Sequence, residues 1–445
     1  MMTRDLRNPV SQSIQAGKTT GQHIMAAAAV YLLAGCAKPS GHPCLSGTAG
    51  EGSEPQALMC RVLPEELASK AEKWGVAKAV SGKIGHDIQG GVEIHLTLDK
   101  NIQQYVEQAL EAAMTNFHPQ AAWAIVQEVR TGAILAMASL PNSEPNRATG
   151  MVFEPGSIFK VGVVAAALNE GRVATNDLFD CENGSWTYGG KPVRDFHPYG
   201  VLDVTGILRK SSNIGVAKIA AKLGPKDLHR YLKSFGFGSP TGLEVSGEEN
   251  GILNPPSMWS KIGVVRVAMG HEVAVTALQI LNVLCCIGND GVLMKPHFIR
   301  QVVDKDVVIL MENKPEALAQ PITARTAEQM RTILIEVTRE GGTGTRGAVP
   351  GYNLAGKTGT AEKIVDGRYS ESESVASFMG LLPAERPEIG IIVVLDNPQP
   401  LRTGSMSAAP VFAQIAAAVA RHLDIQSVYP TYSLPLRKPN ISVAL

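Results

Sequence analysis

The strongest signal in this sequence is the stretch Phe153-Glu-Pro-Gly-Ser-Ile-Phe-Lys160. A proline and a glycine mark the start of a helix, so Ser157 is predicted in its first turn, where free N–H groups and the helix dipole favour negative charge. Lys160 is three residues further on and therefore on the same face, which brings its amine near the serine oxygen. A lysine whose pKa is lowered by burial or by nearby positive charge can take a proton from a serine hydroxyl. The pair is a candidate nucleophile and base.

A second motif, Ser211-Ser212-Asn213, stands beside Lys210 at the mouth of an apolar helical pattern. A hydroxyl at Ser211 can relay a proton towards a leaving group, and the amide of Asn213 can hold a substrate carbonyl.

A third motif, Lys357-Thr358-Gly359-Thr360, follows Leu354-Ala-Gly on a predicted strand. The lysine and Thr358 can bind a carboxylate. Gly359 is expected to let a substrate backbone approach closely, and the N–H of Thr360 can point into an oxyanion hole.

Each motif has a simpler explanation when it is taken alone. Ser157 would then be a helix N-cap with Lys160 a solvated charge, Ser211-Ser212-Asn213 another N-cap, and Lys357-Thr358-Gly359 an accident of composition. Each pattern occurs once, however, and the three follow one another on a helix, a helix start and a strand. That conjunction favours a serine acyl-transfer site.

Composition excludes several other classes. The 445 residues balance 41 Lys+Arg against 41 Asp+Glu, and a nucleic-acid binder would show a basic excess. The six cysteines form no CxxC unit, so no zinc site or dense disulfide framework is expected. We therefore expect a soluble globular body.

Residues 1–36 are predicted to be a signal peptide or a membrane or lipoprotein anchor. Basic residues precede a 12-residue apolar run, Ile24 to Gly35, which as a helix spans about 18 Å, against about 30 Å of bilayer hydrocarbon. The run ends in Leu33-Ala34-Gly35-Cys36, which resembles a bacterial lipoprotein box. A weak uncleaved anchor and a misplaced start codon are the alternatives. Either main interpretation places the rest of the chain across the cell membrane, on its periplasmic side.

The hydrophobic periodicity predicts an α+β domain. Residues 37–90 are interpreted as a linker with a small residual module. A strand is expected from Val92, then a helix capped by Asp99 with apolar residues at helical spacing from Ile102 to Ala113, then a hairpin over 124–138. Further helices are predicted at 157–170, 203–222, 226–234, 274–287, 323–340 and 408–423, and strands at 353–364, 375–382 and 389–396. Since strands bracket a helical middle, both ends should build one antiparallel sheet with helices packed against it.

The three motifs together with their flanking residues resemble class B penicillin-binding proteins, and in particular the division and spore-cortex transpeptidases. The resemblance covers about residues 90–423. It implies the fold shared by serine β-lactamases and penicillin-binding protein transpeptidases, with an antiparallel five-stranded-type sheet flanked by helices and an all-helical subdomain. It further implies a transpeptidase domain at 91–425 and a C-terminal tail at 426–445. The stretches that carry it are Leu96-Thr-Leu-Asp-Lys-Asn-Ile-Gln, Lys210-Ser-Ser-Asn-Ile-Gly, Phe235-Gly-Phe-Gly, Ala355-Gly-Lys-Thr-Gly-Thr-Ala and Ser377-Phe-Met-Gly-Leu-Leu-Pro.

The resemblance also implies a reaction. Ser157 would attack the D-Ala-D-Ala carbonyl of a peptidoglycan stem peptide with Lys160 as base, and D-alanine would leave. Ser211 with Lys357 would help protonate the departing amine. An amine of a neighbouring stem would then take the acyl group, and β-lactams would trap Ser157. The implied reaction needs no metal and no cofactor.

It assigns the remaining motif residues to binding. Asn213 would orient the donor, Lys357 and Thr358 would hold its terminal carboxylate, and the N–H groups of Thr360 and Ser157 would form the oxyanion hole. The implied partners are stem peptides, β-lactams, the membrane through the N-terminus and division-complex proteins. Two departures stand out: only residues 37–90 precede the domain where the family has a large pedestal, and Gly270-His-Glu replaces the usual Gly-Gln-Gly.

Three alternatives remain open on the residues alone. A β-lactamase or a D,D-carboxypeptidase would share the acylation step and pass the acyl group to water. A non-catalytic β-lactam-binding scaffold or sensor would be expected to lack Ser157 or Lys160, or to carry several membrane spans.

Overall fold

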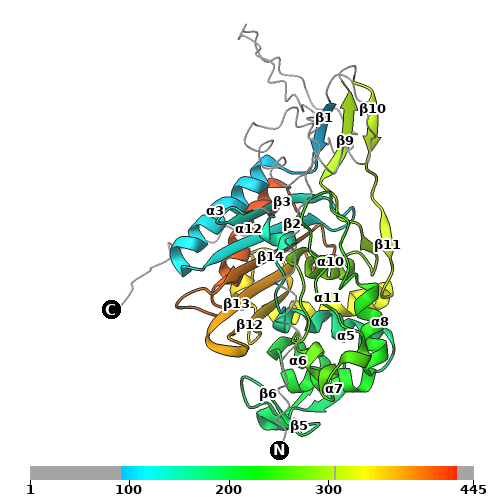
Figure 1. Ribbon diagram of the computed structural model, residues 1–445, viewed down its shortest axis with the longest axis vertical. Coiled ribbons are helices and arrows are strands. Elements are labelled where there is room, and N and C mark those ends of the chain that lie inside the picture. Colours follow the sequence, from blue (N-terminus) through cyan, green and yellow to red (C-terminus); the bar gives the residue numbers. More distant parts are fainter. Residues whose placement is uncertain (1–91, 144, 305–306, 428–445) are drawn as a thin grey trace, which may run out of the picture.

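The computed structural model describes residues 92–143, 145–304 and 307–427 (Figure 1). The predicted anchor at 1–36, the linker at 37–90 and residues 428–445 of the predicted tail lie outside the described residues. Within the described part of the chain, no helix combines the length and the apolar character that crossing a membrane requires.

A five-stranded antiparallel sheet forms the centre of the domain, in the order β12-β13-β14-β2-β3. Its strands come from both ends of the domain, as predicted, so the α+β class is confirmed. The polar stretch 368–374 belongs to β13 although it lacks apolar alternation, because it pairs with the far end of β12. The strands are β2 (Ala121–Glu128), β3 (Ile134–Leu140), β12 (Ala355–Val365), β13 (Arg368–Leu382) and β14 (Ile389–Asp396).

Both faces of this sheet are buried. Successive side chains of a strand point to opposite faces, so in β2 Trp123 and Ile125 enter one core while Ala122 and Ala124 enter the other. The second core lies under α3 (Lys100–Phe117) and α12 (Ala408–His422), and the first under α10 (Ala277–Gly288) and α11 (Ala324–Thr338) (Figure 1). The domain therefore has three layers, helices–sheet–helices.

The helices begin where the sequence predicts them to. Asp99 caps α3 by accepting hydrogen bonds from the N–H groups of Asn101 (2.8 Å) and Ile102 (3.0 Å), which confirms its predicted role. The predicted apolar positions of α3, from Ile102 to Ala113, are buried. In α10, Thr276 and Gln279 form a capping box.

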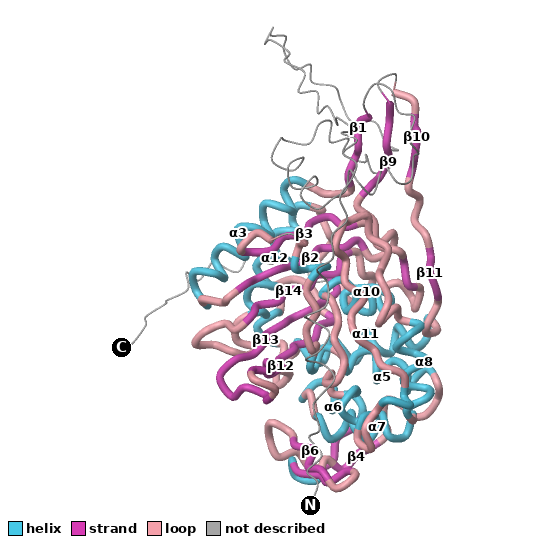
Figure 2. The backbone as a smooth tube through the Cα atoms, viewed as in Figure 1, coloured by secondary structure: helices cyan, strands magenta, loops and turns pink. Residues whose placement is uncertain are grey.

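The middle of the chain forms a mostly helical unit on the first core. It contains α4 (Arg147–Gly150), α5 (Lys160–Asn169), α6 (Val204–Lys210), α7 (Asn213–Leu223), α8 (Pro225–Ser234) and α9 (Gly263–Ala268). It also holds two small sheets that the sequence analysis did not predict: β4 (Leu178–Asp180) with β7 (Val201–Asp203), and β5 (Ser185–Tyr188) with β6 (Lys191–Arg194). Figure 2 shows these strands at the end of the helical unit.

The single helix predicted at 203–222 is wrong. It breaks between α6 and α7, because Ser211 adopts a left-handed conformation (φ 59°) and Ser212 caps a new helix by accepting from the N–H of Gly215 at 2.9 Å. Apolar periodicity runs through the break, and so the pattern alone did not reveal it.

Smaller elements complete the fold. A three-stranded sheet of β1 (Val92–Leu96), β9 (Ile299–Asp304) and β10 (Ile309–Glu312) projects from the end of the domain where the described chain begins (Figure 1). The pair β8 (Leu293–Met294) and β11 (Ala317–Ala319) links it to the helices. Single 3₁₀ turns lie at η2 (Gly156–Ile158), η3 (Glu182–Gly184), η4 (Pro256–Met258) and η5 (Thr345–Gly347).

Candidate active site

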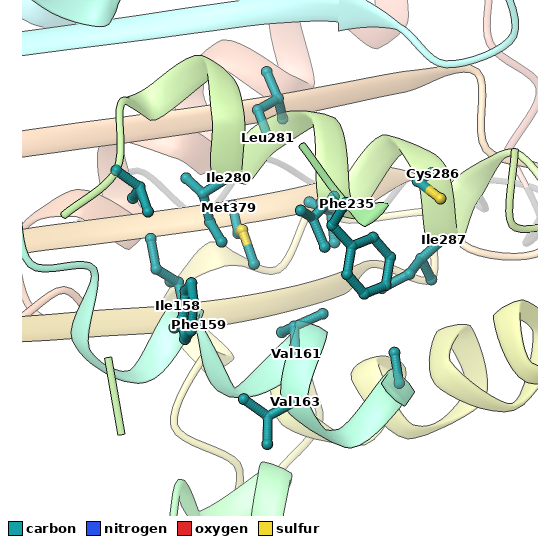
Figure 3. Packing of buried hydrophobic residues seen from close by; sticks show 14 of the residues in the cluster. Ile158, Phe159, Val161, Val163, Phe235, Ile280, Leu281, Cys286, Ile287 and Met379 are labelled. Carbon is teal, nitrogen blue, oxygen red and sulfur yellow. The ribbon is translucent and has the colours of Figure 1, made fainter. Parts of the chain in front are cut away.

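Ser157 lies on η2, a 3₁₀ turn held between β12 and the loop that follows α9. Gly156 has φ +54°, and a Cβ there would come within 2.6 Å of the carbonyl oxygen of Thr360. Gly270 has φ +83°, and a Cβ there would lie 2.2 Å from the carbonyl oxygen of Gly156. Two glycines therefore let three backbone segments meet at the serine. Ile158 and Phe159, which follow Ser157, are buried in the same core as Met379 and so fix the turn to the core (Figure 3).

Lys160 is fully buried one step further along the chain, as the first residue of α5. Its Nζ donates to the carbonyl oxygen of Ser211 (2.6 Å) and to Oδ1 of Asn213 (2.7 Å), and it lies 3.4 Å from Oγ of Ser211. Among the described residues no hydrogen bond joins Lys160 to the hydroxyl of Ser157. Burial lowers the pKa of Lys160 to about 7, against an opposing influence of Asp195.

Lys357 approaches the same point from β12. It is fully buried, and its Nζ donates to Oγ of Ser211 (2.9 Å) and to the carbonyl oxygen of Thr358 (3.1 Å). Burial holds the pKa of Lys357 well below its usual range, and the charge of Lys160 lowers it further. The hydroxyl of Ser211 is thus held between two buried amines, which disfavour each other's protonation.

The left-handed backbone of Ser211 makes this meeting possible. It turns the chain between α6 and α7, so that the carbonyl and the hydroxyl of one residue both reach Lys160. Each residue of the motif thus has its own role: the Ser211 hydroxyl contacts the two lysines, Ser212 caps α7, and the Asn213 amide accepts from Lys160.

Asp195 is a site residue that the sequence analysis missed. Its Oδ1 accepts from the backbone N–H groups of Asn213 and Ile214 (3.0 Å for the latter), and its Oδ2 accepts from Oγ of Ser212 at 2.7 Å. The neighbouring carbonyl of Arg194 accepts from Nδ2 of Asn213 at 2.9 Å. The end of strand β6 thus holds the start of α7, and no local motif signals this contact.

The other residues of the third motif lie on β12, the edge strand of the sheet next to η2. Oγ1 of Thr358 donates to Oγ1 of Thr343 (3.0 Å), and Oγ1 of Thr360 accepts from the N–H of Gly404 (3.2 Å). At Gly359 a Cβ would lie 2.2 Å from Oγ of Ser377 and 3.0 Å from the side chain of Ile158. The glycine is therefore required by packing within the protein, a reason different from the expected approach of substrate.

Behind the serine, Glu154 joins three segments. Its carboxylate accepts from the N–H of Glu272 (3.0 Å) and from the hydroxyl of Tyr369 (3.2 Å), and it pairs with Nδ1 of His271 (2.9 Å). Arg266 in turn donates to the Tyr369 hydroxyl at 2.9 Å. His271, which departs from the family pattern, thus contacts the carboxylate three residues before Ser157.

The described residues hold no group of three or more His, Cys, Asp or Glu side chains arranged to bind a metal ion.

Two buried lysines meet Ser211 and Asn213 between the helical unit and the edge strand β12, and Ser157 lies on the turn next to that strand. This arrangement is typical of one class of serine enzyme, and the family comparison agrees with it. The model of the penicillin binding protein transpeptidase domain matches residues 122–417. The chain belongs to this family, and the resemblance seen in the sequence is confirmed.

Curated relatives place it more closely. It is 32% identical over 365 residues to the probable peptidoglycan D,D-transpeptidase PenA of Neisseria gonorrhoeae, over 79% of this chain and 61% of that protein. It is also 32% identical to the stage V sporulation protein D of Bacillus subtilis, over 73% of this chain and 53% of that protein. The chain thus spans about three fifths or less of these two relatives.

Solved structures agree. The transpeptidase domain of penicillin-binding protein 3 from Burkholderia pseudomallei matches with a TM-score of 0.70 and 32% identity, over 75% of this chain and 98% of that one. Penicillin-binding protein 3 of Mycobacterium tuberculosis, complexed with aztreonam, matches with a TM-score of 0.72 and 31% identity, over 78% of this chain and 82% of that one.

Proposed function

We propose that this protein is a peptidoglycan D,D-transpeptidase that works through an acyl-enzyme on Ser157. The observation that carries the proposal is the Ser211 hydroxyl, which is held 2.9 Å from Nζ of Lys357 and 3.4 Å from Nζ of Lys160. Two buried amines joined by one hydroxyl form a route along which a proton can move between a nucleophile and a leaving group. The names of the relatives, one a probable peptidoglycan D,D-transpeptidase, support the same activity.

Acylation starts with Lys160 in its neutral form. A pKa of about 7 leaves a large fraction of this amine unprotonated near neutral pH, so it can take the proton of Ser157. Oγ of Ser157 then forms a bond to the carbonyl carbon of the penultimate D-alanine. The N–H groups of Ser157 and Thr360 stabilise the negative charge on the carbonyl oxygen. When the C–N bond breaks, Ser211 passes a proton to the departing amine, and D-alanine leaves.

The donor peptide binds along β12. This strand is at the edge of its sheet, so its outer backbone groups can pair with an extended peptide. The ammonium form of Lys357 and the hydroxyl of Thr358 hold the terminal carboxylate, while Asn213 binds a donor carbonyl. Burial lowers the pKa of Lys357, and a bound carboxylate raises it again, because an opposite charge stabilises the ammonium form.

Deacylation completes the cross-link. The amine of a neighbouring stem peptide attacks the ester carbonyl, its proton returns through Lys160, and Ser157 is released. A β-lactam enters as a mimic of the donor and remains bound to Ser157 as a stable ester. Aztreonam and ampicillin are bound to penicillin-binding protein 3 of Mycobacterium tuberculosis, and we extend β-lactam binding to this protein.

We further infer the setting of the enzyme from its N-terminal sequence. Residues 1–36 export or anchor the chain, residues 37–90 are a spacer, and the catalytic domain from residue 91 acts on the extracytoplasmic side of the cell membrane, with division-complex proteins as partners. Globomycin treatment and fractionation of cells test the anchor, since a lipoprotein would accumulate in its uncleaved form.

Intact-mass analysis after incubation with a fluorescent penicillin tests the reaction. We expect one stable adduct that is lost in Ser157→Ala and retained in Ser234→Ala, a change in α8 away from the site. With disaccharide pentapeptide as substrate, dimers should form and free D-alanine should appear. Rapid turnover of penicillin would support a β-lactamase, hydrolysis without dimers a carboxypeptidase, and a folded protein without any adduct a scaffold.

A further inference from the structure

An aromatic hollow lies on the helical unit, outside the site described above. It is open to solvent, has a volume of about 510 Å³, and is lined by Phe179, Trp186, Tyr188, Lys218, Ala221 and Lys222. Trp186 and Tyr188 are two residues apart on β5 and therefore point to the same face, with ring centroids 5.1 Å apart. None of these side chains is used by the proposed reaction.

Two lysines border the rings. Lys218 and Lys222 are one helical turn apart on α7, with Nζ atoms 5.2 Å from the Trp186 ring centroid and 4.9 Å from that of Phe179. Lys218 is neutralised by Glu182 at 2.6 Å. Lys222 is exposed and has no carboxylate within ion-pair distance among the described residues. The hollow thus offers the partly exposed rings of Trp186 and Tyr188 and the ammonium group of Lys222, which is available to an anion.

The same elements connect the hollow to the catalytic amide. Trp186 pairs with Val193 across the β5–β6 hairpin, and the next residue, Arg194, accepts the hydrogen bond from Asn213. From Asn213, helix α7 reaches Lys218 after about 8 Å and Lys222 after about 14 Å, at 1.5 Å per residue. Along the axis of α7 the two lysines of the hollow therefore lie about 8 and 14 Å from Asn213, a distance that a stem peptide with its sugar can span.

We propose that the aromatic hollow binds the glycan part of the substrate, which deepens, and rests on, the proposed transpeptidase function. The C–H face of an amino sugar stacks on Trp186 and Tyr188, and a carboxylate of the attached stem peptide pairs with Lys222. The volume is within the range of pockets that hold ligands of disaccharide size. An aromatic surface edged by a cation suits an anionic muropeptide better than a peptide alone, because stacking needs a flat apolar face.

Calorimetry with two probes tests this. The Ser157→Ala protein, which performs no chemistry, is titrated with uncross-linked disaccharide pentapeptide and with the same pentapeptide without sugar. We expect the sugar-bearing probe to bind about tenfold more tightly. Trp186→Ala should reduce this preference to about twofold or less, while Trp186→Phe retains most of it. Lys222→Glu should weaken the binding of both probes, because both carry the stem carboxylate. Lys226→Glu on α8 is the matched charge control and should leave both affinities intact.

Penicillin acylation at an intact Ser157 is measured separately in each variant. It should stay within about twofold of the parent, because a small β-lactam does not reach the hollow. Equal binding of the two probes by the Ser157→Ala protein, an unchanged preference in Trp186→Ala, or unchanged affinities in Lys222→Glu would overturn the hollow as a glycan site. If penicillin did not acylate the protein with an intact Ser157 and no other change, the proposed function would be overturned instead. The two failures are therefore distinguishable.

Discussion

The chemistry at the scale of single residues depends on two amines that share one hydroxyl. Lys160 and Lys357 are both fully buried, and both reach Ser211. Burial disfavours the charged form of each, and their proximity disfavours two charges at once. The resting site therefore contains a neutral amine near neutral pH, which is what a general base requires.

The rate of acylation by penicillin should rise with pH through a midpoint near 7. Below that pH Lys160 is protonated and cannot accept a proton, whereas above it the neutral base is fully present, far below the usual lysine pKa of 10.5. Stopped-flow acylation between pH 5.5 and 9 measures the midpoint. Lys160→Arg, whose side chain stays charged, should be inactive throughout. A rate that is flat from pH 6 to 8 would contradict Lys160 as the base.

Asp195→Asn should move that midpoint to lower pH. The charge of Asp195 raises the pKa of Lys160, so its removal leaves burial less opposed. The same change weakens the cap of α7 and should cost about 1–2 kcal/mol of unfolding free energy. Asp177→Asn, where the carboxylate also accepts from a backbone N–H (Ala174, 3.1 Å), is the control and should leave the midpoint unchanged. An unmoved or higher midpoint in Asp195→Asn would count against this coupling.

At the scale of elements, the position of Ser157 depends on how closely three backbone segments pack. Gly270, in the loop after α9, packs closely against the backbone of Gly156, and Gly156 packs closely against the backbone of Thr360 on β12. Glu154 adds hydrogen bonds to the same loop and to Tyr369 on β13. The serine is thus positioned by contacts between elements more than by its own helix.

Gly270→Ala should therefore lower the acylation rate by more than about tenfold and also reduce stability by about 2 kcal/mol or more. Its Cβ would lie 2.2 Å from a backbone oxygen that cannot move without moving Ser157. Gly171→Ala is a matched control: φ is +65°, and nothing lies within 4 Å of the added atom. It bears only the backbone strain, about 1–2 kcal/mol. Equal acylation rates in the two variants would refute the packing argument.

At the scale of the whole molecule, the central sheet joins chain segments from both ends of the domain. β2 and β3 precede the helical unit, and β12 to β14 follow it. The chain beyond α12 still contributes: Ile425 is buried against the second core, its carbonyl accepts from the Tyr352 hydroxyl at 2.7 Å, and Oγ of Ser427 donates to the carbonyl of Gly351 at 2.9 Å.

Truncation tests where the domain ends. A chain that stops after Ser427 should keep the unfolding midpoint of the full protein. A chain that stops after Leu423 loses the buried Ile425 and its hydrogen bond, and its midpoint should fall by about 3–6 °C. Differential scanning calorimetry of both chains measures this. If the shorter chain kept its midpoint, the domain would end before Ile425.

Much of this protein could be predicted from local pattern. Strands and amphipathic helices have short periods, so β14, α11 and α12 were predicted close to their observed bounds. The three motifs were also recognisable as a set, because each alone has a simpler explanation but their conjunction on a helix, a helix start and a strand does not. The order of strands from both ends followed from their positions around the helical middle.

Contacts between distant segments decided the rest. The helix breaks at Ser211 although the apolar periodicity of the sequence continues through that point. Asp195 is 18 residues from the backbone N–H of Asn213 that donates to it. The close packing of Ser377 and Ile158 around Gly359 was not predicted either, while the expected approach of a substrate to Gly359 stays a prediction. In each case the free energy comes from a partner far away in the chain. Sequence periodicity therefore specifies which elements form, and only tertiary packing specifies how they hold Ser157, Lys160 and Ser211 in place.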